Sequence, residues 1–397
     1  MKKRIPVLPL LILAFVLLAT SSYIYSALHT LFPSSGIPHF FWVLTVAIFA
    51  GFGLAISRRH KNAEGKLLLY AAHALLILVV AELVTILFLI PGDLYSTIVS
   101  QPRSYNWTLF SAVIFVLTVL LFLYGMIIGK YRYTVKKVTL EFDDLPPLFD
   151  GFKIVQISDV HAGSFKNKTA VKRGISLINA QHADLFVFTG DLVNNKAEEI
   201  KPWIPEFSKI KAPYGQYSIL GNHDYGDYIS WPTPEEKSQN LQELKEAHRH
   251  LGFELLLDRH VAIKNQDEQL ILGGVENWGV GFGERGDLAK TFQHVPEQAF
   301  KILLSHDPSH WETQVKKSYP IVHLTLSGHT HGMQFGLEAF GIKWSPVKYR
   351  YAHWAGLKEE NGRKLYINRG FGFIGFSGRI GIWPEITVLE LKRRNKK

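Results

Sequence analysis

Five short motifs between residues 159 and 331 contain side chains that commonly bind divalent metal ions. Asp159 and His161 follow the apolar run 153–157 and stand two positions apart. Side chains at positions i and i+2 of an extended chain point the same way, so this carboxylate and this imidazole can bind one ion. The later motifs repeat the design of an apolar run followed by polar residues. They are Asp191, the triplet Asn222, His223 and Asp224, then His306, and finally His329 with His331.

The spacing of the motifs predicts that they meet at one edge of a sheet. The first three are 32 and 31 residues apart, which is about the length of one βαβ unit. Each would then follow the next strand of a parallel sheet, at the carboxyl edge where ligands bind in open α/β sheets. Glycine precedes three of the motifs, where it allows a sharp turn at a crowded centre. These glycines are Gly190, Gly221 and Gly328.

The residue types in the motifs select the chemistry. Two carboxylates, one amide and four imidazoles are more than one tetrahedral zinc ion requires. They suit two divalent ions that share a carboxylate. Such a pair stabilises the attacking and leaving oxygens of an in-line displacement at phosphorus and lowers the pKa of a bridging water. A single histidine at a strand end is usually structural, but five such motifs in one domain favour the metal site. The chain has no cysteine, which excludes thiolate ligands, cysteine nucleophiles and disulfides.

Four apolar segments in the first third of the chain predict membrane spans. They cover about residues 5–28, 39–56, 67–90 and 107–128, each long enough to cross a hydrocarbon core of about 30 Å. A cleaved signal peptide is a poor interpretation of the first segment, because three more spans follow it. Glu82 and His73 fall inside the third segment. They are nine positions apart and out of phase on a helix, which favours a single polar contact over a shared functional face.

Charge locates the membrane domain and its orientation. Residues 1–137 carry twelve of the 44 basic residues but only three of the 34 acidic ones, so almost all of the net charge of +10 lies there. The remaining chain has no basic field, which argues against a nucleic-acid partner. Segments rich in Lys and Arg alternate along the chain with loops that have one such residue or none. This pattern predicts a multi-pass protein of the inner (plasma) membrane with its N-terminus and its large C-terminal part in the cytoplasm.

The order of predicted elements indicates a layered α/β fold. From residue 151 onward, apolar strands alternate with segments of helical period, including a helix over 197–210, which implies βαβ units. We therefore expect a membrane domain over 1–130, a linker with a first strand over 131–150, and a catalytic domain over 151–392. The basic tail 393–397 is expected to be solvated or to contact anionic lipid.

The five motifs resemble those of the calcineurin-like metallophosphoesterase superfamily, whose pattern is Asp-x-His, Gly-Asp, Gly-Asn-His-Asp, His and Gly-His-x-His. The resemblance covers about residues 134–392 and is greatest to bacterial membrane-anchored members with N-terminal transmembrane helices. It implies an α/β/β/α sandwich after the four-helix transmembrane region. It also implies two divalent metal ions, with Mn²⁺ favoured and Fe, Zn or Mg as alternatives.

The same resemblance implies a role for each motif. Three residues would hold the first ion, three others the second, and one carboxylate would bridge them. In that order they are Asp159, His161 and His331; Asn222, His306 and His329; and Asp191. His223 would bind the substrate phosphate and protonate the leaving group, with Asp224 orienting it.

The substrate is the least determined feature. The resemblance permits cleavage of a phosphodiester or pyrophosphate bond by a metal-bridging hydroxide, and the membrane tether suggests a lipid-linked phosphoester. Aromatic residues over 335–354 either pack locally or form an apolar wall for acyl chains or a base. Arg379 is either an ordinary surface arginine or the residue that meets a second phosphate. The alternative is a non-catalytic membrane transporter or sensor that uses the metal domain to bind a ligand.

Overall fold

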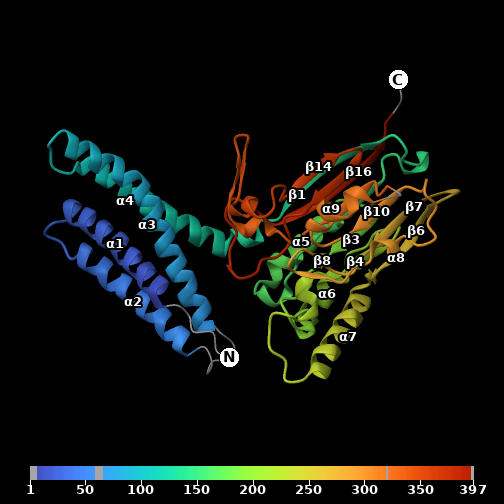
Figure 1. The fold of residues 1–397 in the computed structure, drawn as a ribbon, viewed down its shortest axis with the longest axis horizontal. Coiled ribbons are helices and arrows are strands. Elements are labelled where there is room, and N and C mark those ends of the chain that lie inside the picture. Colours follow the sequence, from blue (N-terminus) through green and yellow to red (C-terminus); the bar gives the residue numbers. More distant parts are fainter. Residues whose placement is uncertain (1–6, 59–65, 319–320, 395–397) are drawn as a thin grey trace. The chain divides into compact units, whose positions relative to one another are not determined.

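The computed structural model describes residues 7–58, 66–318 and 321–394, which form two compact units, 1–124 and 125–397. In the first unit, four long helices bury little of their apolar surface. They are α1 (Val7–Leu31), α2 (Ile37–Ser57), α3 (Lys66–Ile98) and the start of α4 (Tyr105–Ile127) (Figure 1). All four are long and apolar enough to cross a membrane. The charges at residues 2–4, 59 and 61, on which part of the orientation depends, lie outside the described residues, as do residues 395–397 of the basic tail.

Two acidic side chains of α3, Glu82 and Asp93, accept hydrogen bonds within the first unit. Glu82 of α3 is buried and accepts hydrogen bonds from Ser21 (2.7 Å) and Thr20 (3.0 Å) of α1. This confirms the predicted polar contact within the bundle. Asp93 accepts hydrogen bonds from Arg103 through both carboxylate oxygens (2.8 and 2.5 Å). Helix α3 runs eight residues past the predicted span end at residue 90, through Pro91.

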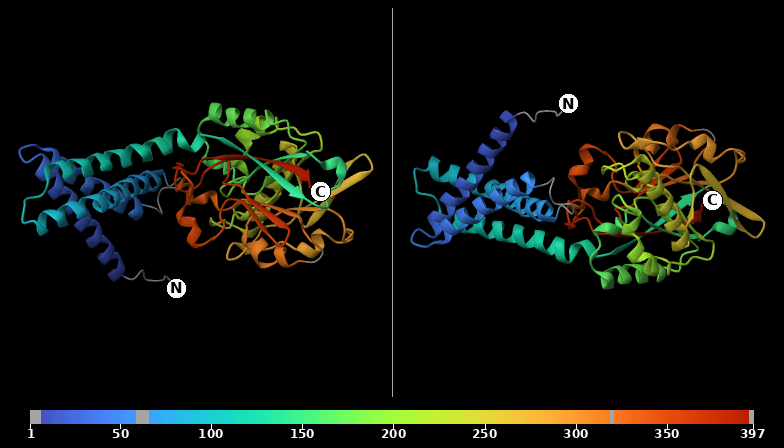
Figure 2. Two further views of the ribbon diagram at one scale, coloured as in Figure 1. Left: turned by 90° about the horizontal axis from the view of Figure 1, so that it is seen from above. Right: turned by 90° about the horizontal axis from the view of Figure 1, so that it is seen from below.

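Two six-stranded sheets form the second unit (Figures 1 and 2). The first has the order β1 (Thr134–Phe142), β16 (Glu385–Arg393), β2 (Lys153–Ile157), β3 (Leu185–Thr189), β4 (Gln216–Ile219), β5 (Glu254–Leu255). The second has the order β14 (Gly356–Glu360), β15 (Arg363–Ile367), β11 (Leu324–Ser327), β10 (Lys301–Leu304), β7 (Glu268–Gly274), β6 (Arg259–Asn265). Strands β2 to β5 are parallel, as are β7, β10, β11 and β15. Two short hairpins, β8 (Trp278–Gly279) with β9 (Gly283–Glu284) and β12 (Leu337–Ala339) with β13 (Ile342–Trp344), lie outside the sheets.

The core between the sheets is apolar on both inner faces. Ile154, Val187 and Ile219 of the first sheet belong to the same buried cluster as Leu272 and Ile302 of the second. Strand residues are nearly continuous apolar runs because a parallel sheet covered on both faces buries both sides of each strand. The two sheets therefore pack face to face, as the predicted α/β/β/α sandwich requires.

Helices cover the outer face of each sheet. Helix α5 (Lys168–Asn179) begins at Asn167, whose side chain accepts a hydrogen bond from the Ala170 amide, and α7 (Pro234–Leu251) ends at Gly252 with φ +78°. Both helices pack on the first sheet, while α9 (Ser309–Thr313) covers the second. The helix predicted over 197–210 is wrong: two 3₁₀ turns and the short α6 (Ile204–Phe207) replace it, because Pro202 and Pro205 interrupt the backbone hydrogen bonds. The single-turn α8 (Leu288–Thr291) follows β9.

Candidate metal centre

The ends of five strands bring the predicted ligands together. Strands β2, β3 and β4 are parallel neighbours, so their three motifs follow one another along one edge, as the spacing predicts. The last two motifs follow β10 and β11, which are neighbours in the second sheet. The centre is therefore assembled from both sheets, rather than from one sheet alone.

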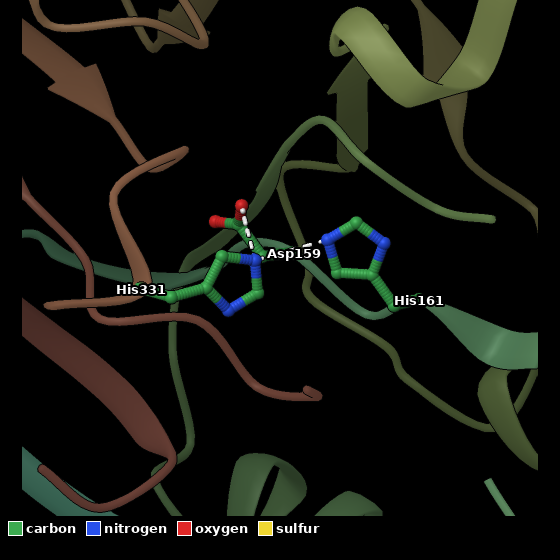
Figure 3. A group of neighbouring side chains, drawn as sticks. All are labelled: Asp159, His161 and His331. Carbon is green, nitrogen blue, oxygen red and sulfur yellow. Dashed lines mark hydrogen bonds and ion pairs between the residues drawn. The ribbon is translucent and has the colours of Figure 1, made fainter. Parts of the chain in front are cut away.

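The first cluster consists of Asp159, His161 and His331, whose candidate ligand atoms all lie within 4.8 Å of one another. Figure 3 shows the three side chains directed toward a common point. Nε2 of His331 lies 3.2 Å from Oδ1 of Asp159 and 2.9 Å from Nε2 of His161. All three residues are buried. Two imidazoles and a carboxylate that converge in this way can hold a divalent cation.

The second cluster consists of Asp191, His306 and His329, again with candidate ligand atoms within 4.8 Å. Nε2 of His306 lies 3.2 Å from Oδ2 of Asp191. Nδ1 of His329 lies 2.9 Å from Oδ1 of Asn222, which places the amide of the fourth predicted ligand beside this cluster. The same Oδ2 of Asp191 is 3.5 Å from His161, so one carboxylate oxygen lies between the two clusters.

The backbone at the ligands is strained. Five ligand residues have positive φ, between +47° and +68°, a region that non-glycine residues seldom occupy. They are Asp159, His161, Asp191, His329 and His331. Such conformations each cost about 1–3 kcal/mol and persist where the surrounding structure holds them for a function.

Burial and neighbouring charges act in opposite directions on the pKa values of the ionisable groups in the two clusters. Burial alone would raise the pKa of Asp159, but the adjacent His331 holds it below the ordinary range. Burial likewise opposes ionisation of Asp191, yet the pKa of this carboxyl lies well below its ordinary value because of His306. Burial disfavours a proton on His306, but Asp191 raises the pKa of this imidazole to about 10. Burial lowers the pKa of His161 to about 3, so this imidazole is uncharged at neutral pH and has a nitrogen lone pair for a cation.

The residues present fit two divalent cations. Nδ1 of His306 lies 2.7 Å from the Thr189 carbonyl oxygen, so its other nitrogen faces Asp191. That Nε2 atom is buried and has no hydrogen-bond partner among the described residues. A buried imidazole nitrogen without a partner, next to an ionised carboxylate, is an appropriate ligand for a cation.

The His223 ring is held by a main-chain carbonyl and not by Asp224. Its Nδ1 lies 2.8 Å from the carbonyl oxygen of Asn194, and its ring is 5.0 Å from that of His161. The Asp224 carboxylate instead accepts hydrogen bonds from four backbone amides, those of Asp191, Leu192, Val193 and Gly221. The predicted orienting role of Asp224 is therefore corrected: a main-chain carbonyl orients His223, and Asp224 holds the loop that carries Asp191.

Arg379 lies behind the centre rather than in front of it. The side chain is fully buried, and it donates to the Gly372 carbonyl through Nε (2.9 Å) and Nη2 (2.6 Å). Nη2 also lies 3.2 Å from Nδ1 of His331. The guanidinium thus has no surface for a second phosphate, which corrects the predicted substrate-binding role of this residue.

A cavity of about 680 Å³ opens over both clusters. Its wall includes part of the predicted aromatic segment, namely Tyr349 and Tyr351, together with Arg350. Sequence reasoning missed Phe282, which belongs to a loop without a motif, and Asp307, which directly follows a ligand. For Asp307, the available signal in the sequence is its position directly after His306.

A double sheet with helices outside and two Asp/His clusters that could hold metal ions place the chain in the class of metal-dependent hydrolases. A family model described as calcineurin-like phosphoesterase matches residues 152–333. A second, described as the transmembrane domain of probable calcineurin-like phosphoesterases, matches residues 4–130. The chain belongs to the calcineurin-like metallophosphoesterases and carries their four-helix transmembrane domain.

Relatives in bacteria and vertebrates share this assignment. The chain is 33% identical over 262 residues to the uncharacterized metallophosphoesterase YkuE of Bacillus subtilis, covering 65% of this chain and 85% of that protein. It is 26% identical over 289 residues to a transmembrane protein with metallophosphoesterase domain of Danio rerio, covering 70% of this chain and 62% of that protein. Among solved structures, a phosphopantetheinyl hydrolase of Mycobacterium tuberculosis matches with a TM-score of 0.34 and 10% identity, over 55% of this chain and 89% of that one.

Proposed function

We propose that this protein is a membrane-anchored phosphohydrolase that cleaves a phosphodiester or pyrophosphate bond in a lipid-linked substrate. It would use two divalent metal ions, of which Mn²⁺ is the favoured one. The observation that carries the proposal is the position of Asp191 Oδ2, within 3.5 Å of a histidine from each cluster. One carboxylate that serves both clusters is the arrangement that two-metal phosphoryl chemistry requires. The four candidate spans support the membrane-bound substrate.

The ligand residues would divide as the two clusters do. Asp159, His161 and His331 would hold one ion, and Asn222, His306 and His329 the other, with Asp191 shared. Bound divalent ions neutralise charge on a phosphoryl group and lower the pKa of a bound water to about 7. The strained backbone at the ligands fixes their side chains before an ion arrives, so little ordering remains to be done.

His223 would supply the leaving group with a proton. Its Nδ1 faces the Asn194 carbonyl, so this nitrogen keeps its hydrogen in both forms of the ring, and Nε2 is the nitrogen that carries a proton in the imidazolium form and gives it to the leaving group. The backbone amide of His223 donates to Oδ1 of Asp191 (2.9 Å), which ties the acid to the bridging carboxylate. The His223 ring lines the cavity, and Tyr228 packs 4.4 Å from it.

Two variants separate metal binding from proton transfer. With bis-p-nitrophenyl phosphate and Mn²⁺, we expect Asp191→Ala and His223→Ala each to lower kcat by about 10²–10⁴-fold. Metal analysis should distinguish them: Asp191→Ala should lose bound manganese, whereas His223→Ala should retain both ions. His250→Ala, an exposed histidine on α7, is the matched control and should behave as the wild type.

Two outcomes would refute the proposal. Loss of manganese from His223→Ala would make this residue a ligand instead of an acid. Equal activity in the wild type and in both site variants would favour the non-catalytic transporter or sensor.

A further inference from the structure

Among the residues that the structure describes, Arg350 is the single Lys or Arg side chain in the wall of the metal-site cavity. The lining residues include the ligands His161, Asp191, Asn222, His329 and His331. Arg350 is exposed and directly follows the 3₁₀ turn Pro346–Tyr349. A positive charge in the wall of a phosphoesterase cavity faces the space that the substrate must occupy.

Aromatic rings fix this guanidinium relative to the metal centre. The guanidinium carbon lies 4.4 Å from the centroid of the Phe282 ring, and that ring stands edge to face on His329 with centroids 4.5 Å apart. His329, Phe282 and Arg350 thus form a continuous stack that leads out of the second cluster. Stacking on an aromatic face is a geometry that arginine favours, and it orients the planar donor fork.

A second connection runs through Tyr351. Its hydroxyl donates to Oδ2 of the buried Asp307 (3.0 Å), and the same oxygen lies 3.3 Å from Nε2 of His329. Tyr351, which directly follows Arg350, is therefore hydrogen-bonded to Asp307, the carboxylate that contacts His329. Both neighbours of the guanidinium, Phe282 and Tyr351, contact His329.

The charge of Arg350 is not satisfied inside the protein. Within the described part of the chain, no carboxylate forms an ion pair with it, and its hydrogen bonds go to uncharged groups, the Val280 carbonyl oxygen at 3.4 Å and the Tyr351 side chain. By contrast, Arg369 is buried between Glu338 and Glu385. A guanidinium that is oriented but unpaired is ready to accept a phosphate or carboxylate through two parallel hydrogen bonds.

We propose that Arg350 binds a second phosphate next to the scissile one, which makes diphosphate diesters the preferred substrate class. This rests on the proposed phosphohydrolase function and selects among its substrates. One water adds across the P–O–P bridge: its oxygen bonds to one phosphorus, and the bond from that phosphorus to the bridging oxygen breaks. The bridging oxygen leaves with the electron pair as part of the other phosphate, one proton is delivered to it through His223, the other proton of the water passes to solvent, and two phosphate monoesters result. Arg350 would stabilise the charge on the departing phosphate.

Binding to the full-length, manganese-loaded protein tests the inference without requiring turnover. Calorimetry with methylenediphosphonate and with methylphosphonate compares two phosphorus groups with one. For Arg350→Ala, we expect the dissociation constant of methylenediphosphonate to rise about 10- to 100-fold, while that of methylphosphonate changes by less than about twofold. Arg350→Lys should fall between, because it keeps the charge but not the fork.

Lys348→Ala is the matched control, because it removes an exposed cation of the same turn that does not itself line the cavity. It should leave both dissociation constants unchanged. An equal change for both ligands in Arg350→Ala, or no change for either, would overturn the role of Arg350. A wild type that hydrolyses neither bis-p-nitrophenyl phosphate nor its diphosphate analogue would refute the proposed function, and the calorimetric comparison would still decide the role of Arg350.

Discussion

Asp307 is the carboxylate that lies behind the ligand His329. Its Oδ1 accepts a hydrogen bond from the backbone amide of Ser309 (2.8 Å), and its Oδ2 lies 3.3 Å from Nε2 of His329. A carboxylate in this position orients the imidazole and makes it a stronger ligand. We expect Asp307→Asn to weaken one of two manganese affinities by about 10- to 100-fold, as measured by calorimetry on the metal-free protein.

The control for this prediction is Asp258→Asn. Asp258 accepts hydrogen bonds from the backbone amides of Glu276 and Asp287 (both 3.0 Å), and it is not a member of either cluster. It should lower stability and leave both manganese affinities intact. Two unchanged affinities in Asp307→Asn would show that His329 needs no support from this carboxylate.

At the residue scale, the convergence of the candidate ligands was predictable and the groups that support them were not. Each ligand belongs to a short motif at the end of an apolar strand, and the structure places all seven in or beside the two clusters. The partner of His223 is the main-chain carbonyl of Asn194, which has no side-chain signature. Asp224 follows His223 directly, yet its carboxylate accepts hydrogen bonds from three amides of the loop after β3 and from the Gly221 amide of its own loop.

The glycines before the motifs serve the strand ends in different ways. Gly190 has φ +94°, so it provides the sharp turn that the sequence predicts. Gly328 has no such φ. A side chain there would collide with Oγ of Ser158 and Oδ2 of Asp159. We expect Gly328→Ala to displace Asp159 and to lower manganese affinity by at least about tenfold, an effect of the size seen when metal-ligand support is lost.

Gly36→Ala is the comparison for this element, because nothing lies within 4 Å of the added carbon. It should bind manganese as the wild type does. Normal manganese binding by Gly328→Ala would mean that the strand end yields without moving the ligand.

Helix α7 carries a buried histidine that makes the fold sensitive to acid. His248 is fully buried, and its Nδ1 lies 2.9 Å from Oγ of Ser218 in β4. Burial lowers the pKa of His248 from 6.5 to about 3. The unfolded chain therefore takes up a proton between pH 6.5 and 3 that the folded chain refuses, so stability is lost as the pH falls through this window.

Replacing this histidine should flatten the dependence of stability on pH. Between pH 6.5 and 5, His248 accounts for about 2 kcal/mol of lost stability, at about 1.4 kcal/mol per unit. We expect His248→Gln to show a smaller fall in unfolding temperature over this range than the wild type. His250→Gln, exposed on the same helix, should follow the wild type. Identical slopes for all three proteins would exclude His248 as the source of acid sensitivity.

At the element scale, periodicity predicted the strands better than the helices. The strands that carry ligands are short buried runs bounded by glycine or polar residues, and they appear where expected. The segment 197–210 shows helical spacing, but its two prolines remove backbone donors and leave separate turns. The assignment of strands to two sheets was not predictable, because the same apolar pattern suits a buried strand in either sheet.

Across the whole molecule, the two family matches divide the chain into a membrane part and a catalytic part. Charge asymmetry predicts which side of the membrane each loop faces. The loop between α1 and α2 has no Lys or Arg, and the loop between α3 and α4 has only Arg103, which is paired with Asp93. Loops poor in basic residues are translocated, whereas the catalytic unit should remain in the cytoplasm.

The absence of cysteine from the chain allows a direct test of this topology. Single cysteines at the exposed positions Ser34 and Ser100, in the two loops poor in charge, should react with a membrane-impermeant maleimide on intact cells. Cysteines at the exposed Ser57, at the end of α2, and Asp267, in the β6–β7 turn, should react only after permeabilisation. Labelling of Asp267→Cys on intact cells would place the metal centre outside the cytoplasm. A substrate drawn from the outer leaflet would then replace the cytoplasmic one, because the hydrolytic site can reach only the lipid surface that it faces.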